Sequence, residues 1–159
     1  MNFISLAGSL YGIFMSINFV SKKNQALTRA RSLSGEKGII NLGAGCSRMG
    51  FSESTCNLPE VVVNVDLTTW GPKAEIHNLQ ERLPFADGEF DVAFASHVLE
   101  HLDHWQEALN DWTRIADHAI IVLPNPLSIG GWIHSEHKQH FSFGDINFIR
   151  QNWAVEVYC

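Results

Sequence analysis

Two glycines and one carboxylate carry the clearest chemical signal in this sequence. Gly43 and Gly45 directly follow a short apolar run, and Asp66 ends a second apolar run, Val61 to Val65. Glycine adopts positive φ and has no Cβ that would block an approaching ligand. A carboxylate about 20 residues beyond such glycines can accept hydrogen bonds from both hydroxyls of a ribose. The spacing indicates a nucleoside site. The alternatives are a tight turn without a ligand and a turn role for Asp66.

Arg48 narrows the kind of nucleoside. A dinucleotide site needs a third glycine, which lets helix and strand pack closely while the pyrophosphate sits on the helix N-terminus. Arg48 stands at that third position. Its bulk argues against NAD and FAD, but not against a nucleoside that carries no pyrophosphate.

Alternating strands and helices must position these residues. Apolar runs predict strands over 38–42, 61–65, 74–77, 90–95, 118–123 and 153–158, and helical spacing predicts helices over 24–33 and 97–115. Apolar runs without clean alternation are typical of strands that are buried on both faces. The sequence therefore predicts an α/β fold, a parallel sheet with helices on both faces, in which ligands bind outside the carboxyl ends of the strands.

The stretch from Asn78 to Leu102 carries a recognisable motif. It contains Leu83-Pro84-Phe85, Asp87-Gly88, Phe90-Asp91 and Glu100-His101 in that order. With the glycine turn and Asp66, residues 36 to 158 resemble the class I S-adenosylmethionine-dependent methyltransferases, in particular the small methyltransferase-type-11-like group. The resemblance implies a Rossmann-like three-layer sandwich with a mostly parallel sheet. We expect six strands, with the family's last strand missing and the sheet edge left short, covered by the N-terminal segment or completed by another chain.

The resemblance also assigns roles to single residues. The cofactor would be S-adenosyl-L-methionine, which becomes S-adenosyl-L-homocysteine. Its methionine part would lie at the glycine turn, its ribose at the end of the second strand, and its adenine at the following loop. The cofactor residues implied are Asn41 and Leu42 (backbone), Gly43, Gly45, Asp66, Leu67, Asn78, Leu79 and Ser96. His97, just past the fourth strand, is the catalytic candidate near the transferred methyl group. Asn41 and Asn78 replace residues that are commonly acidic in the family.

Histidines form two clusters along the chain. His97, His101 and His104 lie on the predicted helix 97–115, where the first two would share a face. The second cluster is His134, His137 and His140. It fits a lid over the acceptor site, ordinary surface histidines or a metal site. No metal is expected, because the spacing matches no strong zinc pattern. Phe90, Phe94, Trp105 and Trp112 are predicted core residues, and Asp87-Gly88 a turn.

Composition bounds the class of protein. The chain has 159 residues, 45% hydrophobic and 18% charged, which suits one domain with a single core. A net charge of −6 makes nucleic acid an unlikely partner. Three cysteines without paired metal-ligand spacing favour a reducing, cytoplasmic location.

The N-terminal segment is apolar and ends in a basic pair. Residues 3–20 contain no charged side chain, and Lys22 and Lys23 follow. A buried or partner-facing helix, an interfacial membrane contact and a membrane span are the three alternatives. We divide the chain into an N-terminal helical and apolar segment, 1–35, and a methyltransferase-like cofactor-binding domain, 36–159.

The sequence predicts a methyltransferase that acts on an unidentified acceptor. The alternative is a catalytically silent methyltransferase-like protein that acts as a binding or partner subunit, within a homo-oligomer or with another protein.

Overall fold

A six-stranded sheet forms the centre of the molecule. The computed structural model describes residues 21–44, 53–67, 73–128 and 135–159. The strands are β1 (Ile39–Leu42), β2 (Val61–Asp66), β3 (Ala74–Ile76), β4 (Phe90–Ser96), β5 (Ala116–Val122) and β6 (Val155–Tyr158). They lie in the order β3-β2-β1-β4-β5-β6, and every neighbouring pair is parallel. The predicted parallel sheet of six strands is confirmed, and β6 pairs directly with β5.

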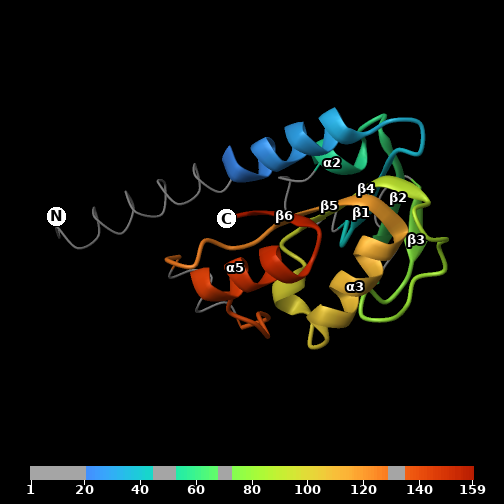
Figure 1. Ribbon diagram of the computed structural model, residues 1–159. Coiled ribbons are helices and arrows are strands. Elements are labelled where there is room, and N and C mark those ends of the chain that lie inside the picture. Colours follow the sequence, from blue (N-terminus) through green and yellow to red (C-terminus); the bar gives the residue numbers. More distant parts are fainter. Residues whose placement is uncertain (1–20, 45–52, 68–72, 129–134) are drawn as a thin grey trace, which may run out of the picture.

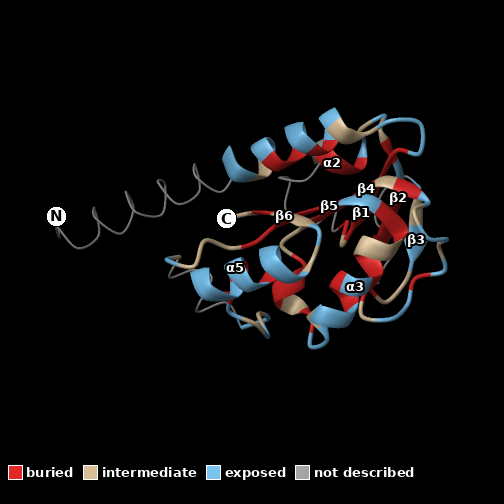
Figure 2. Ribbon diagram, in the orientation of Figure 1, coloured by how far each residue is buried: buried red, intermediate tan, exposed pale blue. Residues whose placement is uncertain are grey.

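Helices cover the sheet on both faces. The helix of residues 21–33 and α2 (Glu53–Cys56) lie on one face, and α3 (Trp105–Ile115) and α5 (Phe143–Asn152) lie on the other (Figure 1). Two separate apolar clusters fill the spaces between these layers. Figure 2 shows the buried stripes of the helices turned toward the strands. The predicted three-layer sandwich is therefore present.

The predicted helix over 97–115 is wrong in its first part. His97 has φ +57°, a 3-10 helix, η1, spans Leu99–His101, and α3 begins only at Trp105. Leu102 is extended, which ends η1, and Gln80 Oε1 accepts hydrogen bonds from the backbone N–H groups of residues 103 and 104. The apolar residues at helical spacing extend beyond α3 in the sequence, because Val98 and Leu102 in this connection are buried as the apolar residues of α3 are. His97 and His101 therefore do not share a helical face.

The Leu83-Pro84-Phe85 motif is fastened to α3. Asp111 Oδ2 accepts from the backbone N–H of Leu83 at 2.8 Å, and Arg114 donates to the backbone oxygens of Leu83 and Phe85 at 3.0 and 2.7 Å. Gly88 adopts φ +63° in the turn before β4, as predicted for Asp87-Gly88. The motif thus fixes the loop between β3 and β4 against the helix that follows.

The predicted aromatic core is largely confirmed. Phe90, Phe94 and Trp112 are at most 3% exposed, and Trp105 is half-buried against the same cluster.

No helix in the described ranges combines the length and the apolar character needed to cross a membrane. The apolar residues 3–20, whose membrane contact the sequence left open, lie outside these ranges, as do Gly45, Arg48 and His134.

Candidate functional site

The glycine turn follows β1 as predicted, and Gly43 is required there by the protein itself. Gly43 has φ +67°, and its N–H and that of Ala44 both donate to the backbone oxygen of Val65, at 2.8 and 3.0 Å. A Cβ on Gly43 would lie 2.2 Å from a methyl group of Val98. The turn therefore needs glycine for its conformation and for its packing against the β4 connection.

Asp66 lies beside this turn. The register pairs Leu42 with Val65, so Gly43 and Asp66 follow at the same edge of the sheet. Asp66 is half-buried, and its Oδ1 accepts from the N–H of Leu67 at 2.7 Å. Leu67 is 67% exposed. A carboxylate and an accessible apolar side chain are thus presented together at the carboxyl end of β2.

Asn41 and Leu42 point their side chains away from this edge. Asn41 is buried, and its Nδ2 donates to Asn64 Oδ1 at 2.8 Å, while Asn64 Nδ2 donates to the backbone oxygen of Cys56 at 3.2 Å. Leu42 is fully buried in the apolar cluster on the α3 side. The side chains of these two residues are therefore engaged in the interior, and a backbone contact of Asn41 and Leu42 with a cofactor stays a prediction. The amide at 41 is matched to the amide at 64.

Asn78 and Leu79 lie next to Asp66 in space. The N–H of His77 donates to the backbone oxygen of Asp66 at 3.1 Å, which brings this loop to the end of β2. The Asn78 amide is engaged locally, accepting from Gln80 N–H at 3.1 Å and donating to Glu81 at 2.8 Å. The Leu79 side chain is buried. The loop therefore offers its backbone and an amide already held in place.

Ser96 and His97 end β4, which is the other neighbour of β1. The N–H of His97 donates to the backbone oxygen of Val122 at 3.0 Å, which holds the residue at the carboxyl edge despite its positive φ. His97 Nδ1 lies 2.9 Å from Oε1 of Glu100, whose side chain is 1% exposed. The structure thus brings Gly43, Asp66 and His97 to one edge of the sheet, while Gly45 lies outside the described residues.

Three residues lie together beside His97, and the sequence did not predict their proximity. Glu100, His101 and His137 place one potential ligand atom each within 4.8 Å of one another. The backbone N–H groups of Lys138 and Gln139 donate to the backbone oxygen of Glu100, at 2.8 and 3.0 Å. This pairing joins segments more than 30 positions apart. The single usable signal in the sequence was the Glu100-His101 pair.

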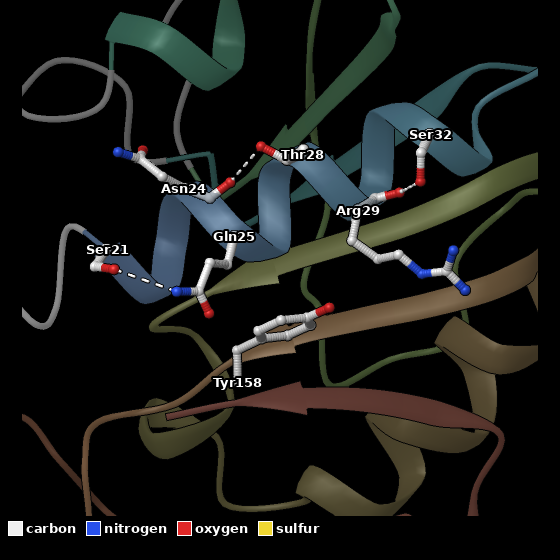
Figure 3. Close-up of a pocket in the computed structure, with 7 residues that line it drawn as sticks. All are labelled: Ser21, Asn24, Gln25, Thr28, Arg29, Ser32 and Tyr158. Carbon is white, nitrogen blue, oxygen red and sulfur yellow. Dashed lines mark hydrogen bonds between the residues drawn. The ribbon is translucent and has the colours of Figure 1, made fainter.

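The hollows formed by the described residues include a small one and a larger, open one. A small one of about 20 Å³ lies between Glu100, the turn of residues 124–126 and the segment 137–141. A larger, open one of about 840 Å³ lies between the helix 21–33 and Tyr158 of β6, and the residues that line it carry polar side chains (Figure 3). Burial and then the hydrogen bond to Glu156 raise the pKa of Tyr158 there. This larger hollow contains none of the predicted site residues, so its size alone does not make it the site.

Comparison with known proteins adds independent information. Residues 42–119 match the model of a family described as a methyltransferase domain. One similar solved structure is a chain of the complex between the Haloferax volcanii Trm112 methyltransferase activator and a proposed methyltransferase, with 15% identity and a TM-score of 0.46. The match covers 69% of this chain and 53% of that chain, so this chain spans about half of its length. No curated protein sequence matches.

Proposed function

We propose, from the premise that this chain belongs to the class I S-adenosylmethionine-dependent methyltransferases, that it binds S-adenosyl-L-methionine at the carboxyl edge of the sheet and transfers its methyl group to an acceptor. One observation carries the proposal. β1 and β2 end in register, so the Gly43 turn and the Asp66 carboxylate adjoin, with Leu67 exposed beside them.

The residues at this edge fit an adenosine. Asp66 supplies a carboxylate at the strand end, where such groups accept hydrogen bonds from ribose hydroxyls. Leu67 is exposed and apolar, which suits the face of an adenine ring. Asn78 and Leu79 follow from the neighbouring loop, which is hydrogen-bonded to Asp66. The Gly43 turn brings bare backbone to the same place, and we assign Gly45 to it as well.

The acceptor belongs on the β4 side of the same edge. When bound, S-adenosyl-L-methionine supplies an electrophilic methyl group on a sulfonium, so the protein chiefly has to align the acceptor and exclude water. We assign Ser96 to the cofactor boundary and His97 to the acceptor. Glu100 Oε1 lies 2.9 Å from His97 Nδ1, so a carboxylate adjoins the imidazole that would face the acceptor.

The proposal is tested with the demethylated product, because the acceptor is unidentified. Calorimetric titration with S-adenosyl-L-homocysteine should give one site per chain. Asp66→Ala removes charge-assisted hydrogen bonds, so the affinity should fall roughly tenfold or more. The matched control is Asp117→Ala, because Asp117 is exposed near the amino end of β5 and pairs only with Lys37 among the described contacts.

The outcomes separate cleanly. An unchanged affinity in Asp117→Ala with a loss in Asp66→Ala supports the proposed site. Equal affinity in wild type and Asp66→Ala contradicts the role of Asp66. No heat and no thermal shift with either the cofactor or its product would leave the silent binding protein as the better description.

A further inference from the structure

The buried side chain of Glu100 needs a partner. It is fully buried, and neither carboxylate oxygen accepts a well-oriented hydrogen bond from any residue that the structure describes. His97 Nδ1 lies 2.9 Å from Oε1, and a carboxylate oxygen of Glu100 also lies within 4.8 Å of ring nitrogens of His101 and His137. A buried carboxylate is stable when it is paired, hydrogen-bonded or bound to a metal, and is otherwise costly. The environment of Glu100 therefore points to a cation.

His101 presents a lone pair in the correct place. Its Nδ1 lies 3.0 Å from the backbone oxygen of Glu136. A carbonyl oxygen only accepts, so Nδ1 carries the proton and Nε2 carries the lone pair. Ligating histidines commonly donate their second ring nitrogen to a backbone carbonyl in this manner, because the bond fixes the tautomer and the ring orientation.

His137 is held opposite the same two residues. Its ring centroid lies 4.9 Å from that of His101, at 74° between the ring planes. The hydrogen bonds from Lys138 and Gln139 to the Glu100 backbone fix this segment, and an ion pair between Lys138 and Asp103 adds a side-chain contact. The three ligand atoms lie within 4.8 Å of one another. Ligands about 2.1 Å from a tetrahedral ion lie about 3.4 Å apart, so small side-chain rotations close the shell.

The adjoining cavity has room for one ion or one water-sized ligand. Its volume is about 20 Å³, and both Glu100 and His137 line it. A space of about 10–15 Å³ holds one water-sized particle. The cavity also reaches Asn125 and Phe141, on the side of the sheet edge where β4 and β5 end.

We propose that Glu100, His101 and His137 bind one divalent first-row transition ion such as Zn²⁺. Two imidazoles and one carboxylate suit zinc and its neighbours, whereas Mg²⁺ and Ca²⁺ prefer oxygen ligands. Three protein ligands leave at least one position open, as in catalytic sites. We assign that position to an oxygen atom of the methyl acceptor, a step that rests on the proposed function. The ion would act there as a Lewis acid that favours loss of the hydroxyl proton to water; the oxygen would then form a bond to the methyl carbon while the bond from that carbon to sulfur breaks and S-adenosyl-L-homocysteine leaves.

The test uses the full chain and Co²⁺ alone. The chelator-treated protein is titrated with Co²⁺ while its visible absorption is recorded, since low-coordinate Co²⁺ absorbs strongly. We expect one equivalent to bind and Zn²⁺ to displace it. Glu100→Gln, His101→Gln and His137→Gln should each weaken binding at least about tenfold. His118→Gln is the control, because His118 is exposed at the opposite edge of the sheet, and it should bind as the wild type does.

Each outcome decides the matter. No saturable binding, or equal loss in His118→Gln, overturns the site, because the ion is then absent or held by scattered histidines. If Glu100→Gln fails to fold by circular dichroism, the half-buried His137→Gln decides alone. S-adenosyl-L-homocysteine is titrated in parallel. If Co²⁺ binds and S-adenosyl-L-homocysteine does not, the proposed function is contradicted and the metal site is retained. If S-adenosyl-L-homocysteine binds and Co²⁺ does not, the metal site is contradicted and the proposed function is retained.

Discussion

The two halves of the carboxyl edge of the sheet are built from different chemistry. On the β1–β3 side, Asn41, Asn64 and Asn78 have their amides engaged by neighbouring groups, and Asp66 is the carboxylate at the strand ends. On the β4–β5 side, Glu100 is buried without a well-oriented hydrogen bond and is surrounded by imidazoles. The amide groups on the β1–β3 side are therefore hydrogen-bonded within the protein, whereas the buried carboxylate on the β4–β5 side suits a cationic ligand.

Under the proposed function, this difference would correspond to the two tasks of a group-transfer site. A bound nucleoside is recognised by shape and a few hydrogen bonds, so neutral amides and bare backbone serve as its frame. An acceptor must be aligned and polarised, which requires charge in a dry environment. Under the two proposals above, the neutral Asn41–Asn64 pair would belong to the frame around the nucleoside, and Glu100 would belong to the ligand-binding part of the acceptor side. Substitutions in the frame should change stability, whereas substitutions around Glu100 should change ligand binding.

Gly43→Ala should cause the largest loss of stability, because Gly43 lies where the turn after β1 packs against Val98, which follows β4. Alanine at φ +67° is strained by about 1–2 kcal/mol, and a Cβ 2.2 Å from Val98 adds an overpacking cost of about 1–3 kcal/mol. We expect the free energy of unfolding in urea to fall by about 4 kcal/mol, near the sum of these estimates.

A double variant separates the two causes in Gly43→Ala. Adding Val98→Ala removes the methyl groups that the new Cβ meets, so the double variant should be more stable than the sum of the single losses predicts, by about 1–2 kcal/mol. Strict additivity would show that the clash is absent. Gly144→Ala, in the first turn of α5 and without positive φ, should stay within about 1 kcal/mol of the wild type.

Arg114→Met tests the brace that fixes the loop after β3. The Arg114 side chain is 14% exposed and bonds to Asp111, Asp87 and two backbone oxygens of the motif. Its loss leaves the Leu83 and Phe85 oxygens without these donors and leaves Asp111 with the Leu83 N–H bond but no counter-ion among the described residues. We expect a loss of about 3 kcal/mol in urea unfolding. The stability of Arg114→Lys should lie between those of the wild type and Arg114→Met, because lysine keeps the positive charge but lacks the several planar donors of the guanidinium group.

Arg82→Met is the matched control for Arg114. Arg82 lies on the same loop, is 74% exposed and approaches Asp87 only to 3.9 Å, so its removal should change stability by less than about 0.5 kcal/mol. Equal losses in Arg82→Met and Arg114→Met would mean that general loop charge, rather than the fixed hydrogen bonds, stabilises the motif.

Asn41→Asp tests whether the frame must be neutral. The new carboxylate would be buried and would replace the donor that Asn64 Oδ1 accepts from, and turning the Asn64 amide would break its bond to Cys56. We expect a loss of about 2 kcal/mol in urea unfolding. Asn110→Asp, exposed and serving as an acceptor for Trp153, is the control and should lie within about 0.5 kcal/mol of wild type. A stable Asn41→Asp protein would refute the matched-amide interpretation.

How far the sequence predicts this molecule depends on the range of the interactions. The strand run Phe90 to Ala95 was readable because burial on both faces of β4 leaves a nearly continuous apolar pattern. The run Val61 to Val65 was readable from its β-branched residues, although Val62 is 39% exposed. Asp66 could be placed at the edge, because its strand ends there. The roles of these edge residues remain predictions.

Features that depend on contacts between residues far apart in the sequence could not be predicted. The helix over 97–115 failed because buried residues outside a helix, such as Leu102, continued its spacing, while Gln80 satisfied the N–H groups at its start. The approach of His137 to Glu100 depends on backbone hydrogen bonds from residues 138 and 139. No local pattern encodes that contact. The identity of Gly43 also had a second cause, the Val98 methyl groups, that only the packing reveals.

Asp145→Asn should have the smallest effect, and it probes how the His137 segment enters α5. Ser142 and Asp145 form a capping box, and the hydrogen bonds from the Ser142 side chain and backbone lower the pKa of Asp145. A depressed pKa means that this stabilisation is full above the unfolded pKa and is lost as the pH falls through the folded one. At pH 7 the variant should lose about 1 kcal/mol, and the difference from wild type should shrink below about pH 4. In a Ser142→Ala background the same substitution should cost less, because the hydroxyl donor is gone and only the backbone N–H of residue 142 still bonds to Asp145. A loss that stays constant between about pH 7 and pH 3 would show that the Asp145 carboxylate does not cap the helix, and that the entry to α5 is set by the packing of Ile146 and Ile149 instead.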